Sequence, residues 1–414
     1  MVKSYVDKGT AGAFHAVCAL RRFRFLEDLQ LSGLDNAGFK ELLSALTSSS
    51  VSKLALPRGT FAMHAFELSP PVSASGVPAL ICLKQLDLIG CSAYSDDLLE
   101  WFASAAPHLE ELRVSCNPGL ARPMLTLPSL RVASLYICAS LTDEAVQQLC
   151  KGSTLLEDIN LWRCASLREP AISGRNLTKV NVSECFELCD EAFQYIGCLS
   201  DGGSSVRSIL TAGCPRLSFP PIVGHESLIE LDLSSTELRD EAVTAACIAA
   251  QLLERLDISH CRSLVAPVIG CPTLRTLIAT GCDGLSDEAV SAACSRSPSL
   301  MTLRLSLCTS LCQPTIRAPN LVEAHLCGCS ELQDAAVTQL CASSNHLTTL
   351  GLKMCASLVA PTALSDVLEK LDLSYCEKLR APRIGGRSLY NLKLAGCSQP
   401  VSYTHLTLPT KRIV

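Results

Sequence analysis

LERLDISHC, residues 253–261, follows the pattern L-x-x-L-x-L-x-x-C, and the same pattern returns along most of the chain. Clear copies are LKQLDLIGC (83–91), LEDINLWRC (156–164), LMTLRLSLC (300–308) and LEKLDLSYC (368–376). With the weaker copies included, fourteen repeats begin at residues 83, 109, 130, 156, 177, 206, 228, 253, 274, 300, 321, 347, 368 and 389. Two looser copies, LEDLQLSGL (26–34) and VSKLALPRG (51–59), precede them. Self-similarity at this period indicates a repeat architecture.

The nine-residue pattern predicts a short strand followed by a turn. Its L-x-L core alternates with period two, as a strand with one buried face requires. One repeat cannot bury its leucines alone, but stacked repeats can, as parallel strands along one side of a solenoid. The ninth position is Cys in twelve repeats and Asn117 or Thr236 in the other two. We expect a small side chain there that bonds the backbone of the turn.

These features resemble the leucine-rich repeat, in its cysteine-containing subtype, over nearly the whole chain. The resemblance implies an α/β fold, a right-handed leucine-rich-repeat solenoid with a parallel sheet on its concave face. Residues 1–398 would form about 16 repeats, regular from residue 83, and residues 399–414 a non-repeat tail that resembles translated adapter sequence.

The spacing between repeats alternates between long and short. Long repeats carry LTDEAVQQLC (141–150), LCDEAFQYIGC (188–198), LRDEAVTAAC (238–247), LSDEAVSAAC (285–294) and LQDAAVTQLC (332–341), each of which predicts a short amphipathic helix with acidic residues in its first turn. Short repeats carry proline six residues after position nine, at residues 170, 267, 314, 361 and 382, with residues 123 and 220 at the same offset. Proline favours extended backbone there, so helical and extended segments should alternate on the convex side.

An acidic pair between two cysteines, Asp287-Glu288, looks at first like a catalytic or metal site. The pair returns at residues 143–144, 190–191 and 240–241, always at a predicted helix start, and Cys294 returns at the same offset as residues 150, 247 and 341. A catalytic pair would be needed once. We therefore interpret the pair as architecture and Cys294 as a residue of the buried helix face.

Composition narrows the classes of function. The net charge of −5 provides no basic footprint for nucleic acid. The longest apolar runs are about half of the ~18 residues that a membrane span needs, and the start has no apolar segment typical of a signal peptide. The 24 cysteines in a chain without an export signal are expected to be reduced, with those at position nine buried.

No motif points to catalysis, so we expect no enzyme and no cofactor. The closest cysteine pair is Cys327 and Cys329, and it lacks a C-x-x-C partner or a histidine cluster, so no metal is expected. Asn176 and Asn181 match the glycosylation acceptor pattern, and we interpret both matches as accidental.

Function is instead expected on the concave face, where positions three, five, seven and eight point away from the core. Most residues there are small or simply solvated, and aromatic residues and Arg are the usual anchors of interfaces. Trp162 and Arg163 are the sharpest candidates, with Tyr136 on the preceding strand, so the three should form one patch. The candidate protein-binding residues are Tyr136, Trp162, Arg163, His260, Arg304, His325, Lys353 and Tyr375, beside the apolar Ile137, Leu307 and Met354.

The cysteine-type repeats with D-E-A-V helices are also similar to those of F-box/leucine-rich-repeat proteins, in which the repeats capture a substrate for a ubiquitin ligase. Residues 1–24 show no F-box pattern, so an adaptor would bind only through an F-box upstream, and we expect a fragment at both ends. The resemblance implies a monomer in the cytoplasm or nucleus that binds a protein substrate, without nucleic acid or membrane. A scaffold or inhibitor unrelated to ubiquitin, and a ligand sensor, remain as alternatives.

Overall fold

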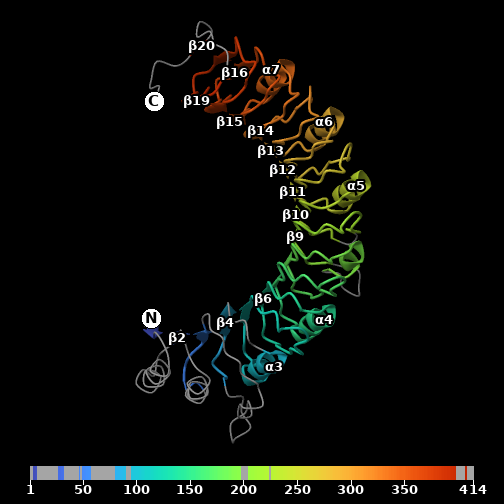
Figure 1. Ribbon diagram of the computed structural model, residues 1–414, viewed down its shortest axis with the longest axis vertical. Coiled ribbons are helices and arrows are strands. Elements are labelled where there is room, and N and C mark those ends of the chain that lie inside the picture. Colours follow the sequence, from blue (N-terminus) through green and yellow to red (C-terminus); the bar gives the residue numbers. More distant parts are fainter. Residues whose placement is uncertain are drawn as a thin grey trace, which may run out of the picture. The chain divides into compact units, whose positions relative to one another are not determined.

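The computed structural model describes residues 3–6, 27–31, 46, 49–56, 80–89, 95–196, 204–222, 225–397 and 406–407. The chain divides into two compact units, Met1–Cys214 and Pro215–Val414, which we call the N-terminal and C-terminal units. In each unit the strands lie side by side along the inner edge and the helices lie on the outer edge (Figure 1). We call the inner surface the strand face.

The N-terminal unit is a ladder of parallel strands in chain order, with helical segments between some of them. Its strands are β1 (Lys3–Val6), β2 (Asp28–Leu31), β3 (Lys53–Ala55), β4 (Gln85–Ile89), β5 (Glu111–Ser115), β6 (Val132–Tyr136), β7 (Asp158–Asn160), β8 (Lys179–Asn181) and β9 (Ser208–Leu210). Among its described residues, the helices with defined bounds are α3 (Asp96–Ala105), α4 (Asp143–Gly152) and the 3₁₀ helix η2 (Asp190–Gln194). The repeat pattern predicted neither β1 nor α3.

The C-terminal unit repeats this plan. Its main sheet holds β10 (Glu230–Asp232), β11 (Arg255–Asp257), β12 (Thr276–Ile278), β13 (Thr302–Arg304), β14 (Glu323–His325), β15 (Thr349–Gly351), β17 (Lys370–Asp372) and β19 (Asn391–Lys393), all parallel. The helices are α5 (Asp240–Ala249), α6 (Asp287–Arg296) and α7 (Asp334–Ser343). A second parallel sheet, β16 (Thr362–Leu364), β18 (Arg383–Gly385) and β20 (Leu406–Thr407), is separate from the main one.

The register of the strands confirms the predicted repeat. Position four pairs with position four of the next repeat, as Leu256 pairs with Leu277 and Leu277 with Leu303. All three leucines are buried. Within each unit, stacking in register therefore builds a core from side chains that no single repeat could bury, which is the α/β leucine-rich-repeat solenoid expected from the sequence.

The predicted alternation is also confirmed. Every proline at the short-repeat offset lies outside helices, at residues 123, 170, 220, 267, 314, 361 and 382. One helix prediction was wrong, because the described residues of segment 188–198, up to residue 196, form the five-residue 3₁₀ helix η2 and no α-helix. Gly197 stands where the other long repeats have a helical Cys, and glycine disfavours an α-helix by about 1 kcal/mol, which weakens the segment.

The described cysteines at position nine are buried, as predicted, except Cys397, which is half-buried. Cys164, Cys282 and Cys308 are buried and unpaired, and each thiol donates a hydrogen bond to a main-chain carbonyl of the preceding repeat. Their Sγ–O distances are 2.9, 3.1 and 3.0 Å. The side chain thus joins adjacent repeats rather than only closing its own turn. Cys91, the first of this series, lies outside the described residues.

Candidate protein-binding surface

The turn after each strand has an unusual backbone conformation that the repeat pattern did not predict. In every repeat from residue 109 onward, position eight has a positive φ. The non-glycine residues with this conformation are Cys116, Ile137, Arg163, Glu184, Ser235, His260, Leu307, Met354 and Tyr375, with φ between 55° and 62°. Side chains other than glycine rarely adopt this left-handed region. Position eight therefore projects its side chain from a tight turn at the edge of the strand face.

The structure refines the placement of the candidates. Tyr136, Arg304 and His325 lie in strands β6, β13 and β14, as expected. Trp162, Arg163, His260, Lys353 and Tyr375 lie in the turns just after their strands, and not on them. Trp162 is half-buried, whereas the sequence had suggested an exposed strand position.

Tyr136, Trp162 and Arg163 form one patch, as predicted. The ring centroids of Tyr136 and Trp162 are 6.3 Å apart with planes inclined by 39°. The Arg163 guanidinium lies over the Trp162 ring, 5.3 Å from its centroid. Arg163 Nε also forms an ion pair with Glu184 Oε2 at 2.9 Å. We call Tyr136, Trp162, Arg163 and Glu184 the aromatic cluster; sequence reasoning missed Glu184, which occupies position eight of the next repeat.

The aromatic cluster interrupts a row of small side chains. In the N-terminal unit, position seven is Ser115, Ser183 or Ala212 in the neighbouring repeats. The backbone does not require a large residue here, because the Trp162 amide hydrogen is accepted by Asn160 Oδ1 at 3.0 Å in the same way that the Ser183 amide is accepted by Asn181. The large rings are therefore not explained by the geometry of the turn.

A hollow of about 330 Å³ lies on the strand face beside Tyr136. Its walls combine apolar, cationic and acidic side chains, from Ile89, Arg113, Val132, Ser134, Tyr136, Asp158, Asn160, Lys179 and Asn181. Burial raises the pKa of Asp158, and the nearby Lys179 opposes that shift. A second hollow, of about 350 Å³, shares Arg113 and extends over β2, β3, β4 and β5. The surface next to the aromatic cluster is thus indented and of mixed charge.

The remaining candidates lie in the C-terminal unit. Lys353 Nζ is 5.3 Å from the centroid of the Tyr375 ring. His325 Nε2 is 3.9 Å from Glu323 Oε2, and its pKa is lowered by burial and by Arg304. The exposed His260 lies against Gly281, which holds position eight of the next repeat. The structure thus groups Lys353 with Tyr375 and, on the paired strands β13 and β14, Arg304 with His325.

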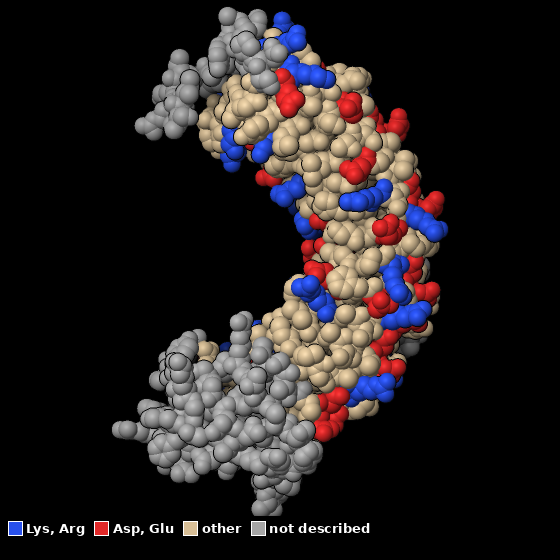
Figure 2. Space-filling model, viewed as in Figure 1, with Lys and Arg blue, Asp and Glu red and all other residues tan. Residues whose placement is uncertain are grey.

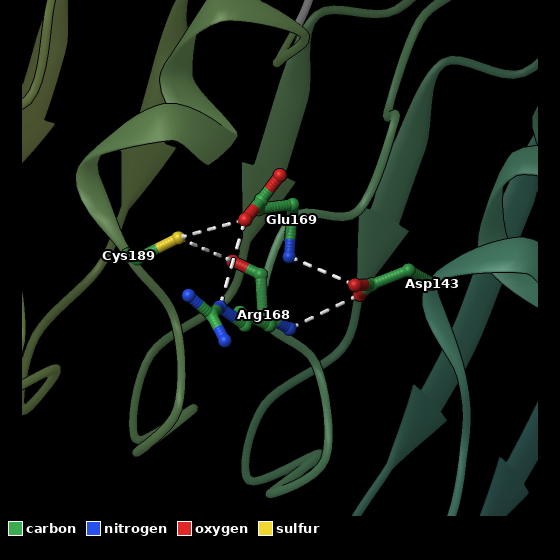
Figure 3. A network of polar contacts seen from close by, with 4 residues as sticks. All are labelled: Asp143, Arg168, Glu169 and Cys189. Atoms are coloured by element: carbon green, nitrogen blue, oxygen red, sulfur yellow. Dashed lines mark hydrogen bonds and ion pairs between the residues drawn. The ribbon is translucent and has the colours of Figure 1, made fainter.

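One cluster of ligand-type side chains occurs among the described residues, and it lies away from the strand face. Potential ligand atoms of Glu169, Cys189 and Glu191 lie within 4.8 Å of one another. Figure 3 shows the Arg168 guanidinium beside Glu169, at 3.5 Å, and the Cys189 thiol directed at Glu169 Oε1, at 3.7 Å. Partial burial and Glu191 raise the pKa of Cys189, which disfavours a metal-binding thiolate. Arg168 already supplies the positive charge of this network.

The aspartate at the start of each long-repeat α-helix has a structural role, as expected. Asp143, the first residue of α4, accepts hydrogen bonds from the amides of Arg168 and Glu169 in the next repeat, at 3.1 and 2.9 Å (Figure 3). Asp96, Asp240, Asp287 and Asp334 make equivalent pairs of bonds. The carboxylate at each helix start therefore fastens two repeats together.

Both glycosylation-type asparagines have main-chain partners. The Asn176 side-chain amide donates to the Thr154 carbonyl at 3.1 Å, and Asn181 is engaged with Ser183. Within the described part of the chain, no helix has the length and apolarity that a membrane crossing demands.

No protein-family model and no curated protein matches the chain. Among solved structures, the complex of Rad7 and Elc1 from yeast aligns with 18% identity over 97% of this chain and 88% of that chain, with a TM-score of 0.42. The leucine-rich-repeat protein LIC12759 of Leptospira interrogans has 15% identity over 92% and 86%, with a TM-score of 0.46. The functional domain of InlJ from Listeria monocytogenes, which includes a cysteine ladder, has 16% identity over 86% and 65%, with a TM-score of 0.40. At these values none of the likenesses bears on what this chain binds.

Proposed function

We propose that the chain is a non-catalytic protein-binding array whose strand face captures a protein partner around the aromatic cluster. The observation that carries this proposal is the interruption of a row of small side chains by Tyr136 and Trp162, with Arg163 stacked on Trp162. Half-buried aromatic rings and Arg beside an indented surface are typical of the residues that dominate binding energy in interfaces.

The mixed charge of the hollow beside the cluster favours a protein over a strongly anionic ligand. Arg113 and Lys179 are accompanied by Asp158, so the hollow is not a basic pocket. Protein interfaces commonly combine a desolvated aromatic centre with a polar rim, and this surface has both.

At a finer level, we propose that the captured protein is a substrate of an F-box ubiquitin ligase. The support is the sequence resemblance, in the cysteine at position nine and the D-E-A-V helix starts. The position-nine thiols and the aspartates at the helix starts both form hydrogen bonds between adjacent repeats. They therefore hold the repeats together without using the strand face, where a substrate would bind. A cytoplasmic or nuclear site of action fits the unpaired thiols of the described cysteines.

Replacing Trp162 by Ser tests the binding array, because Ser is the commonest residue at position seven of the repeats. Binding of the partner captured by the unchanged protein should weaken by about 2 kcal/mol, or roughly 30-fold. The midpoint of thermal unfolding should change little, since the ring is only half-buried. The control is Phe186→Ser, which removes an exposed aromatic ring at position ten, off the strand face. Equal binding by Trp162→Ser and the unchanged protein would contradict the proposal.

The link to ubiquitin needs a separate measurement. The endogenous protein, purified from its own cells, should carry a ubiquitin-ligase adaptor with it, and the captured partner should accumulate in cells from which the protein has been removed. A partner whose abundance does not respond, together with no adaptor in the purified complex, would favour a scaffold or inhibitor instead. That result would leave the binding role of Trp162 intact.

A further inference from the structure

A second surface of the C-terminal unit combines positive charge with exposed apolar side chains. It consists of Arg304, Leu307, Lys353, Met354, Lys370 and Tyr375, from the repeats that begin at residues 300, 347 and 368. We call these six residues the basic–apolar surface. In the upper part of Figure 2, Lys and Arg gather along the strand edge of these repeats.

The cations of this surface are exposed and lack acidic partners. In the described part of the chain, no carboxylate lies within ion-pair distance of Arg304, Lys353 or Lys370. Lys393, on the next strand, differs because it is paired with Asp372 at 3.6 Å. Lys353 instead lies over the Tyr375 ring. The surface thus offers three exposed cations that have no direct ion-pair partner among the described residues, which attracts an acidic ligand.

The apolar side chains are not needed by the backbone. Leu307, Met354 and Tyr375 all occupy position eight, with φ of 61°, 62° and 60°, and they are 49%, 55% and 53% exposed. Glycine holds the same position at residues 281, 328 and 396. A left-handed conformation costs a non-glycine residue on the order of 1 kcal/mol, and a half-exposed side chain recovers only part of that through burial. The large apolar residues at these three positions are therefore not explained by the stability of the turn itself.

Neighbouring glycines make room for two of these side chains. A Cβ atom on Gly328 would come within 2.6 Å of Leu307, and one on Gly396 would come within 2.5 Å of Tyr375. Leu307 and Tyr375 therefore lie across the turn of the next repeat, where glycine leaves room for them. Three exposed apolar side chains thus lie at position eight along one edge of the strand face, and Lys353 lies over the Tyr375 ring.

We propose that the basic–apolar surface binds an acidic peptide segment of a protein partner, with apolar side chains of that segment packed on Leu307, Met354 and Tyr375. This inference rests on the proposed function and names the chemistry of its partner. A polyphosphate chain fits less well, because Glu323 and Asp372 lie on strands between or beside the cations. Strands β13 to β19 of the main sheet span about 19 Å at ~4.8 Å per step, which about six extended residues would cover.

The experiment is a selection from a display library of random peptides of about ten residues, with the full chain as bait. Enriched peptides should contain Asp or Glu beside Leu, Met or aromatic residues. Their affinity should fall about tenfold or more for the triple variant Leu307→Gly, Met354→Gly and Tyr375→Gly, since each lost anchor contributes to the interface. Glycine suits the left-handed turn, so the triple variant should remain folded.

A second variant tests the charge. Lys353→Glu with Lys370→Glu should reduce the affinity at least as strongly and weaken its dependence on salt. Matched controls are Ser235→Gly, which changes position eight of a repeat outside the surface, and Arg317→Glu, which reverses an exposed charge on an extended segment away from the strands. Both controls should bind the enriched peptides as the unchanged protein does.

Several results would overturn the proposal. They are a library that yields no binder, enriched peptides that are neutral or basic, equal binding by both surface variants, and tighter binding of a single-stranded oligonucleotide or of anionic phospholipid vesicles at the same surface. The Trp162→Ser variant separates this failure from that of the proposed function. If Trp162→Ser loses the captured partner while the surface variants keep it, only the present inference fails.

Discussion

Arg163, Glu184 and Tyr375 share a backbone conformation that few non-glycine residues adopt, with φ of 59°, 55° and 60°. Each lies at position eight, in the turn after a strand, and its side chain extends along the next repeat. Arg163 and Glu184 meet as an ion pair in this way, whereas Tyr375 covers Gly396. At the residue scale, the left-handed backbone at position eight thus directs these side chains toward the next repeat, where they make the contacts described.

His225 is a residue whose environment predicts a dependence of stability on pH. Its side chain is fully buried, and neither ring nitrogen has a hydrogen-bond partner. Burial lowers its pKa from 6.5 to about 4. The third residue before other repeats is small, as at Ala250, Ser297 and Ser344, so the buried imidazole is peculiar to this repeat among those compared.

We expect the free energy of unfolding to decrease as the pH falls from about 6.5 to about 4. The unfolded chain takes up a proton on this imidazole near pH 6.5 while the folded chain resists it until about pH 4, so the folded state loses up to about 3 kcal/mol across that window. Denaturant titrations of the unchanged protein and of His225→Ser at several pH values measure the difference. Parallel pH profiles for the two proteins would show that His225 is not the source.

At the scale of elements, the helices of the long repeats are fastened to the short repeats through one carboxylate each. Asp287 begins α6, and its two oxygens accept the amides of Cys312 and Gln313 at 3.0 and 2.7 Å. The adjacent Glu288 is exposed and lies on the same helix turn. Comparing substitutions of Asp287 and Glu288 therefore separates two contributions to stability: the hydrogen bonds made by the carboxylate, and the general effect of negative charge at a helix start.

Replacing Asp287 by Ala should lower the free energy of unfolding by about 2 kcal/mol, because two amides lose a charged acceptor. Glu288→Ala removes the same charge without those bonds and should cost no more than about 0.5 kcal/mol. Chemical denaturation measures both values, and hydrogen exchange should show faster exchange at the Cys312 and Gln313 amides in Asp287→Ala. If the two variants lose equal stability, the carboxylate acts only through its charge.

At the scale of the whole molecule, the buried thiols mark the continuity of the core through each unit. Burial raises the pKa of Cys138 to about 11 and those of Cys164 and Cys308 to about 12. By contrast, Cys82 and Cys116 are exposed. Because the thiolate is the reactive form, chemical modification should distinguish the two sets.

Iodoacetamide at neutral pH should alkylate Cys82 and Cys116 in the native protein and leave the buried cysteines of position nine unmodified. A pKa near 12 in place of 9 lowers the fraction of thiolate about a thousandfold, and burial also blocks the reagent. Peptide mass spectrometry over a denaturant series would follow each cysteine. Cysteines of neighbouring repeats should become reactive together, since each repeat is stabilised by its neighbours. Rapid native alkylation of Cys164 or Cys308 would contradict the buried ladder.

Much of this protein could be predicted from periodicity alone. The recurrence of leucine, cysteine, proline and D-E-A-V segments predicted the parallel strands, the alternation of helical and extended segments, and the structural role of Asp287. These features depend on residues close together in one repeat, and repetition makes a weak local signal strong. Repetition also showed that Tyr136, Trp162 and Arg163 depart from the common pattern.

Only the tertiary structure decided the features that join one repeat to the next. The partner of Arg163 is 21 residues away at Glu184, the amides bound by Asp287 belong to the following repeat, and the side chain of Leu307 lies over Gly328. The left-handed turn at position eight was equally invisible in the pattern, because large residues and glycine alternate there. The physical reason is that the sequence sets the period within a repeat, whereas contacts between repeats depend on the register and direction in which the stacked chain places its side chains.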